Sequence, residues 1–158
     1  MTTVQNFAEQ LLFGQTLQDK LTKPTALDYQ SLTRGIPLPN LPSRPSHLKF
    51  SHERLPFPKN FADERARAQA LHFFANHELL AIELMALCLL KFPDVSVSFQ
   101  RGLVHTITEE QEHLRLYLDR LQELGGEVGE VPVNGFFWDC LSDMNDPMDF
   151  VVGMSMTF

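Results

Sequence analysis

The sequence predicts an all-α protein organised around a long antiparallel pair of helices. Apolar residues recur at helical spacing over two long stretches, residues 61–92 and 96–124. A short turn at Pro93 separates these stretches, as expected for neighbouring antiparallel helices. Seven of the ten prolines lie between residues 24 and 58, where they exclude both a helix and a central strand. A proline-rich strap should therefore precede a helical hairpin.

The composition excludes several classes of protein. The 158 residues are 44% apolar and 21% charged, which is ordinary for one soluble domain. A net charge of -7 argues against a nucleic-acid-binding surface, which would be basic. The N-terminus lacks the features of a signal peptide, and the apolar run 79–90 is interrupted by Glu83 and is too short to span a bilayer. We expect a cytoplasmic protein with neither a membrane nor a nucleic acid as partner.

The two cysteines, Cys88 and Cys140, are too few and too far apart to indicate a disulfide framework. Cys88 lies in a strongly apolar run. This position predicts a buried thiol.

The first 60 residues are expected to form a helix and a strap. Residues 4–20 predict a short amphipathic helix that packs across a larger bundle. Residues 21–60 should be extended and partly polyproline. Their apolar residues favour a strap lying on the domain over a free linker: Leu38, Leu41, Leu48, Phe50, Leu55 and Phe57. The chain thus divides into residues 1–60, with helix and strap, and residues 61–158, the helical domain.

The first long helix should begin near residues 61–64, with Asn60 as its N-cap, and end near Phe92. Its apolar stripe comprises Leu71, Phe74, Ala81 or Ile82, Met85 and Cys88. Glu78 occupies a position in this stripe where a hydrophobic residue is expected.

The second long helix, residues 96–124, should end at Gly125 and Gly126. Glu110 and His113 lie inside its apolar stripe and share one face because they are three residues apart. A carboxylate and an imidazole that face a core need a partner, and a metal ion would use both. Glu-x-x-His is the spacing found in di-iron helix bundles. The alternative is a pair on a charged surface.

The register of the hairpin relates these anomalous positions. Glu78 and Glu110 each lie 16 residues from position 94, so the two carboxylates should be level, about 24 Å from the turn. The same rule pairs Glu83 with His105 in a competing polar layer. Glu83 is about 140° around the helix from Glu78, so both cannot face one centre. The layer with Glu110 and His113 is preferred because it includes their i, i+3 pair.

The remaining polar candidates have plain interpretations. His77 should support a ligand or lie on a helix face, and His72 and His105 should be surface or hydrogen-bonded core residues. Asn76 is expected at the surface. Tyr117 either packs in the core or presents its phenol to the site.

The C-terminal segment should be rich in turns, with Phe136, Phe137 and Trp138 covering one end of the core. Asn145 or Asp146 would cap a further helix that starts at Pro147. The sequence stops within the apolar stripe of that helix. We therefore expect the chain to be part of a longer protein.

Three blocks of sequence resemble a known family. HFFANHELLAIELMALCLLKFPD, GLVHTITEEQEHLRLYLDRLQELGGEVGEVPVNGFFWD and DPMDFVVGMSMTF are similar to the uncharacterised bacterial ferritin-like family called domain of unknown function 455. The similarity is strong over residues 60–158 and weak before them. The family belongs to the ferritin-like superfamily, which includes ribonucleotide reductase small subunits, rubrerythrin and a tRNA hydroxylase.

The resemblance implies a ferritin-like helix bundle with a di-iron centre, or manganese in the same ligands. This chain would hold its N-terminal half, a long antiparallel helix hairpin plus the start of a third helix. Glu78 would be a terminal ligand, Glu110 a bridging or terminal ligand, and His113 a ligand through one ring nitrogen. The glutamate and Glu-x-x-His expected from the third and fourth helices are not in this sequence.

Three interpretations follow. The chain is half of an O2-dependent oxidoreductase or hydroxylase with an unidentified small-molecule substrate. Alternatively, it forms a homodimer in which two hairpins complete the bundle and its ligand set. Finally, it is a non-catalytic iron-binding protein or a metal-free helical protein that self-associates.

Overall fold

The computed structural model describes residues 2–29 and 32–157, and most of their regular structure is helical, which confirms the all-α class. Two two-residue strands, β1 and β2, pair in parallel. The elements are β1 (Thr2–Thr3), α1 (Val4–Phe13), α2 (Leu17–Leu21), β2 (Leu27–Asp28), the 3-10 turn η1 (Ser46–Leu48), α3 (Glu64–Lys91), α4 (Val97–Glu123), α5 (Phe136–Leu141) and α6 (Pro147–Thr157).

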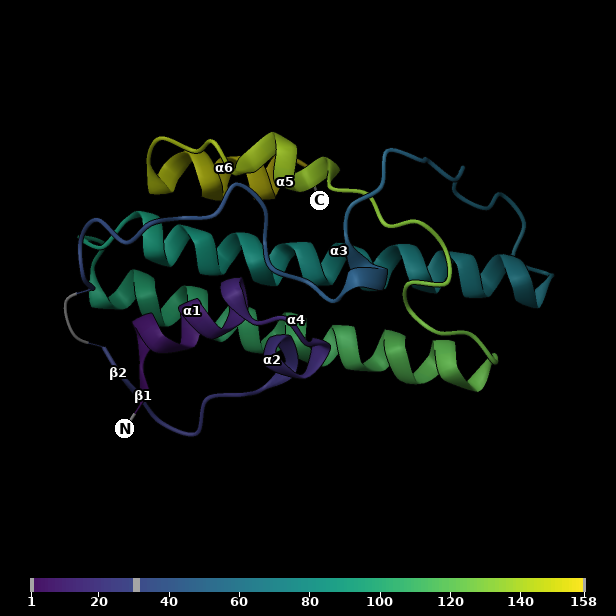
Figure 1. Ribbon diagram of the computed structural model, residues 1–158, viewed down its shortest axis with the longest axis horizontal. Coiled ribbons are helices and arrows are strands. Elements are labelled where there is room, and N and C mark those ends of the chain that lie inside the picture. Colours follow the sequence, from purple (N-terminus) through teal and green to yellow (C-terminus); the bar gives the residue numbers. More distant parts are fainter. Residues whose placement is uncertain (1, 30–31, 158) are drawn as a thin grey trace.

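Helix α3 is the centre of the structure. Helix α4 runs antiparallel along one side of it, α5 and α6 lie on the other side, and α1 crosses the pair (Figure 1). Residues 79–90 of α3 are all buried, because these neighbours surround that half of the helix. In the other half Phe73 and Phe74 are exposed, so α3 passes from a fully covered half to a half with an open side.

The helical hairpin has the predicted bounds and turn. Helix α3 ends at Lys91, two residues before Pro93, and the Ser96 hydroxyl caps α4 by accepting the Phe99 N–H. Helix α4 ends before Gly125, whose φ of 77° suits glycine. The predicted cap of α3 was wrong: Asp63, rather than Asn60, accepts a backbone N–H of the first turn.

The predicted helix over residues 4–20 is two helices. Helix α1 stops at Phe13, and Gly14 follows in an extended conformation. Thr16 and Asp19 then form a capping box that starts α2 in a new direction. A local cap here outweighs the amphipathic periodicity that predicted one continuous helix.

The C-terminal segment covers α3 as predicted, but with an additional helix. Trp138 in α5 is buried, and its indole N–H donates to the Asn40 carbonyl of the strap at 2.8 Å. Phe136 is exposed instead of covering the core. Asp146 caps α6 by accepting the N–H groups of Met148 and Asp149, as predicted.

The N-terminal segment is fastened to α3 by a buried charge cluster. The Glu83 carboxylate is 0% exposed and lies 3.2 Å from the Lys20 ammonium and 2.7 Å from the Arg44 guanidinium. Lys20 also donates to the Leu11 carbonyl at 2.5 Å, and Arg44 donates to the Asn76 side chain at 2.9 Å. Two cations thus accompany one carboxylate, and burial lowers the pKa of Lys20.

These contacts exclude the competing layer of Glu83 with His105, and they show that the expectation for Asn76 was wrong. Glu83 does not pair with His105, whose exposed ring instead lies 3.5 Å from Glu109 one turn along α4. Asn76 is buried, because both Arg44 and the Asn134 carbonyl bind its amide. Level positions in a hairpin can meet only when both side chains also point between the helices, and His105 points away.

Helix α3 as a whole is long and apolar enough to cross a membrane, although its apolar run 79–90 alone is too short. Of its most apolar 18-residue window, 78% is buried inside the protein, as in the core helix of a soluble protein. Cys88 lies in this window and is buried as predicted, and burial raises the pKa of its thiol to about 12.

His72 is a hydrogen-bonded core histidine. Its Nε2 accepts the Gly129 N–H at 2.8 Å and so holds the loop after α4 against α3. Burial lowers the pKa of His72 below its ordinary value of 6.5, since the charged ring would lose both hydration and this hydrogen bond.

Removal of the buried Glu83 charge should destabilise the fold strongly. The Glu83→Gln variant leaves Lys20 and Arg44 buried without an anion, which should cost about 3–5 kcal/mol. Urea unfolding followed by circular dichroism measures this loss. Glu109→Gln, on the exposed face of α4, is the control and should change stability by less than about 0.5 kcal/mol. Equal losses in the two variants would contradict the role of Glu83.

His72 should make the fold sensitive to mild acid. Its folded pKa is depressed, so its contribution is fully present above pH 6.5 and is lost as pH falls and the unfolded chain alone takes up the proton. The melting temperature of wild type should therefore fall more between pH 7 and pH 5 than that of His72→Gln, which keeps an acceptor that does not titrate. His105→Gln, at an exposed site, should follow the wild type.

Candidate metal centre

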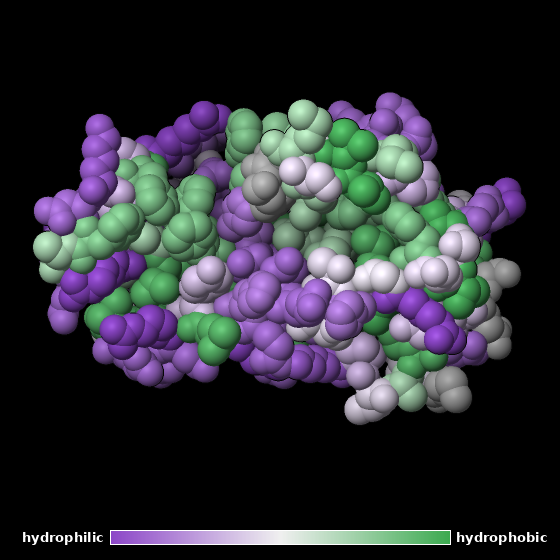
Figure 2. Space-filling view, turned by 180° about the vertical axis from the view of Figure 1, so that it is seen from behind, coloured by the Kyte–Doolittle hydropathy of each residue, from purple (hydrophilic) through white to green (hydrophobic). Residues whose placement is uncertain are grey.

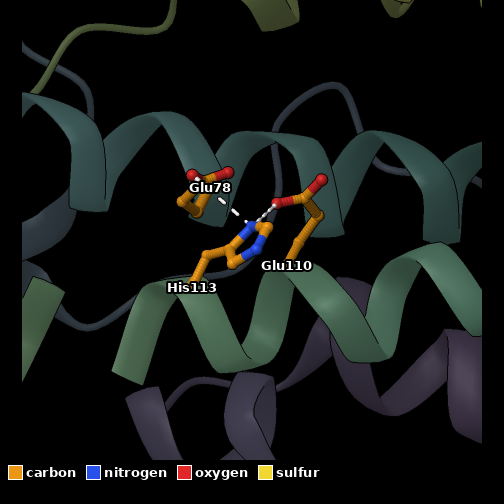
Figure 3. A group of neighbouring side chains, drawn as sticks. All are labelled: Glu78, Glu110 and His113. Carbon is orange, nitrogen blue, oxygen red and sulfur yellow. Dashed lines mark hydrogen bonds and ion pairs between the residues drawn. The ribbon is translucent and has the colours of Figure 1, made fainter. Parts of the chain in front are cut away.

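The structure brings Glu78, Glu110 and His113 together. Glu78 projects from α3, and Glu110 and His113 project from adjacent turns of α4 toward it (Figure 3). Ligand atoms of the three side chains lie within 4.8 Å of one another. The hairpin turn fixes this meeting, because it sets Glu78 level with the two positions on α4.

The cluster is deep on one side and open on the other. The Glu78 side chain is 15% exposed, that of Glu110 22%, and that of His113 53%. His113 Nδ1 lies 2.8 Å from Glu110 Oε2 and 4.0 Å from Glu78 Oε1 (Figure 3). The two carboxylates therefore form the floor of the cluster, and the imidazole lies at its open edge.

Two carboxylates in one partly buried site repel each other. Burial, a hydrogen bond with Glu110 and the charge of Glu110 together raise the pKa of Glu78 from 4.5 to about 8. Glu78 therefore keeps a proton at neutral pH, although it belongs to a residue type that is normally ionised. A cation placed between the carboxylates would replace that proton, because it would also remove the repulsion between two negative charges.

The neighbours of the cluster are aromatic. Phe74, one turn before Glu78, stacks on Tyr117, one turn after His113, with ring centroids 5.7 Å apart. Tyr117 is half-buried, and burial and the nearby charges of Glu78 and Glu110 raise the pKa of its phenol. Tyr117 thus combines the two alternatives, since its ring packs while its hydroxyl lies in the field of the cluster.

His77 lies beside the cluster without joining it. Its ring contacts Phe137 edge-on, with centroids 4.3 Å apart, and burial lowers its pKa to about 4. His77 therefore faces α5 and lies outside the group of three side chains.

The sequence did not predict how the strap contributes to this region. Phe57, from the strap, packs edge-on against Phe61, Phe73 and Phe74, with ring centroids 5.2–6.0 Å apart. A groove of about 360 Å³ lies beside this group, between the open half of α3 and the end of α4. Leu71, Phe74, Tyr117 and Leu124 line the groove, with Arg67 and Arg120 at its edges.

The three side chains suit a divalent transition metal. Two carboxylates and one imidazole are ligands for iron, manganese or zinc, whereas a site for calcium or magnesium would contain oxygen ligands alone. The raised pKa of Glu78 agrees with a site that lacks positive charge of its own. A metal site of this kind needs at least three His, Cys, Asp or Glu side chains whose ligand atoms lie close together. Among the residues that the structure describes, Glu78, Glu110 and His113 form the one such group.

Comparison with known protein families confirms the resemblance to domain of unknown function 455. A family model described as "Protein of unknown function (DUF455)" matches residues 3–158. The match includes the N-terminal helix and strap, where the resemblance seen in the sequence was weak. Among curated proteins and among solved structures, no match is found.

Glu78→Gln should stabilise the metal-free protein at alkaline pH. The folded pKa of Glu78 is raised, so its contribution is fully present below pH 4.5 and is lost as pH rises through about 8. Glutamine mimics the protonated acid and should gain roughly 1 kcal/mol at pH 9, a figure reduced from the full pKa shift because the cluster opens to solvent. Urea unfolding at pH 6 and pH 9 tests this, with Glu109→Gln as the exposed control.

Proposed function

The chain belongs to the DUF455 family, whose function is unknown, and we propose from its candidate metal centre that it is a ferritin-like di-iron carboxylate protein. With a completed metal site it would oxidise or hydroxylate a small molecule with O2 and a reductant. The convergence of Glu78, Glu110 and His113 within 4.8 Å carries this proposal. One helix contributes a glutamate and its antiparallel neighbour a Glu-x-x-His pair, which is half of the ligand set of di-iron helix bundles.

Each residue has a role in holding the metal. Glu78 lies deepest and would bind as a terminal carboxylate. Glu110 contacts both of the other ligands, which suits a carboxylate that bridges or binds. His113 would bind through one ring nitrogen, and its present hydrogen bond to Glu110 already orients the ring toward the carboxylates. A bound pair of iron ions would supply the redox chemistry for oxidation by O2.

The surroundings limit the access of water from two sides of the cluster, while the side of His113 stays open. The Phe74–Tyr117 stack closes the side of the cluster that faces the groove. On the turn side, the buried half of α3 leaves no polar path, since residues 79–82 are buried and apolar. Tyr117 lies within the influence of the charges of Glu78 and Glu110, so its hydroxyl is a candidate donor to a group bound at the cluster.

An iron-binding protein without turnover is the second candidate. The exposure of the His113 ring favours it, because a half-open site can exchange metal with solvent. Oxygen consumption separates the two functions, since only the oxidoreductase consumes O2 repeatedly when a reductant is supplied.

The chain should bind ferrous iron through these three residues. Under anaerobic conditions Glu78→Ala, Glu110→Ala and His113→Ala should each weaken binding about tenfold or more, because each removes a ligand. Isothermal titration with ferrous iron gives the affinity, and elemental analysis gives the iron per chain.

The matched controls are Glu109→Ala and His105→Ala. This pair has the same residue types on the same helix, and it is exposed and remote from Glu78. Both variants should bind iron like the wild type. Less than a tenth of an equivalent of iron in the wild type, unchanged by Glu110→Ala, would exclude both metal-binding functions.

A further inference from the structure

The cluster has too few ligands for the centre it resembles. One chain brings two carboxylates and one imidazole, which can neutralise a single divalent cation and leave coordination positions unfilled. Di-iron helix bundles use a glutamate from each of two helices and a Glu-x-x-His pair from each of two others. Two copies of α3 and two copies of α4 would supply that set, and their four carboxylates would balance two divalent cations.

The open side of the cluster is bordered by exposed apolar surface. Figure 2 shows hydrophobic side chains over the open end of the α3–α4 pair and a second group over α5 and α6, with hydrophilic residues between them. In the first group Phe57, Phe61, Phe73 and Phe74 are each 38–47% exposed. Neighbouring exposed aromatic rings on this scale are typical of an interaction site.

The edges of this surface carry compensated charge. Arg67 lies 3.8 Å from Glu64, and Arg120 lies 2.5 Å from Glu123, each pair within one helix. Both arginines that line the groove are therefore already paired with a carboxylate in the single copy. An apolar centre with polar pairs at its edge is the usual anatomy of an interface between copies.

We propose that a second copy of this chain docks on the open α3–α4 face around a twofold axis, an inference that rests on the proposed metal-binding function. Glu78, Glu110 and His113 of both copies would then enclose two metal ions. A twofold contact pairs the same patch with itself, so the aromatic surface of one copy covers that of the other. The exposed His113 ring becomes enclosed at the junction. The site is then formed by the dimer and is incomplete in either copy alone.

Metal binding and association must strengthen each other in such a dimer. By linkage, the factor by which ferrous iron tightens the dimer equals the factor by which dimer formation tightens iron binding, typically about 5–150-fold. Analytical ultracentrifugation of the full chain, with and without anaerobic ferrous iron, should show a dimer tightened by iron and holding two iron ions.

Two variants test the docking face while leaving the ligands in place. Phe74→Asp and Phe61→Asp put a charge on the exposed aromatic surface, the second at a position outside both helices. Each should remain monomeric with iron and lose affinity for iron by the linkage factor, with helical content unchanged by circular dichroism. Val97→Asp is the control, because Val97 is exposed at the start of α4, about 20 Å along the helix from Glu110. It should dimerise like the wild type.

The outcomes separate this inference from the proposed function. A wild-type monomer that binds iron through the three ligands, with the same affinity in Phe74→Asp, would overturn the dimer and leave the metal function standing. A wild type that binds no iron would overturn the metal function and the shared site with it. A dimer with two iron ions, lost in both aspartate variants, would support both.

Discussion

The buried carboxylate of Glu83 is the constraint on which the path of the first 60 residues depends. An ionised group inside α3, with apolar residues on every side, is tolerated only when cations reach it. Lys20 and Arg44 do so from two separate segments, the end of α2 and the proline-rich strap. Those two contacts fix where α1 crosses the hairpin and where the strap turns back along it. The strap can remain irregular because a few polar contacts, rather than a ladder of backbone hydrogen bonds, hold it.

Helix α3 carries two carboxylates five residues apart, Glu78 and Glu83, and these two side chains have opposite kinds of charged neighbour. Glu83 is buried beside two cations and accepts several hydrogen bonds from Arg44. Glu78 instead faces a second carboxylate, and its pKa rises to about 8. A fold under selection for stability alone would place a cation or an apolar residue beside Glu78. The contrast between a carboxylate paired with two cations and one that faces another carboxylate makes Glu78 a candidate functional residue.

The sequence predicted the hairpin and the Glu78 layer because both follow from local rules. Pro93 ends one helix and sets the turn, and the rise per residue then makes Glu78 and Glu110 level. The partners of Glu83 could not be found in this way, since Lys20 and Arg44 are far from it in sequence and no periodicity connects them. The register rule gave His105 instead, because it supplies height along the helix but not direction around it. Asn76 was misplaced for the same reason, as its partner is Arg44. Gly14 and the Thr16–Asp19 capping box could have revealed the break between α1 and α2, had turn chemistry been weighed above amphipathicity.

The change along α3 from a covered half to an open half connects the fold to the proposed site. The covered half pairs Glu83 with two cations and buries the apolar residues 79–82 and 84–90 of α3. This packing allows the other half to keep Glu78 next to Glu110, an arrangement that is unfavourable in the metal-free protein. The ligands lie where the covered half ends, so they are held by a rigid scaffold and still face an open side. A metal ion and a second surface remove two different costs at this point, the repulsion of the carboxylates and the exposure of the aromatic side chains. Because the two costs occur one helical turn apart, at Phe74 and Glu78, relieving one would favour relieving the other, so the proposed binding of metal and the proposed association of copies would be coupled.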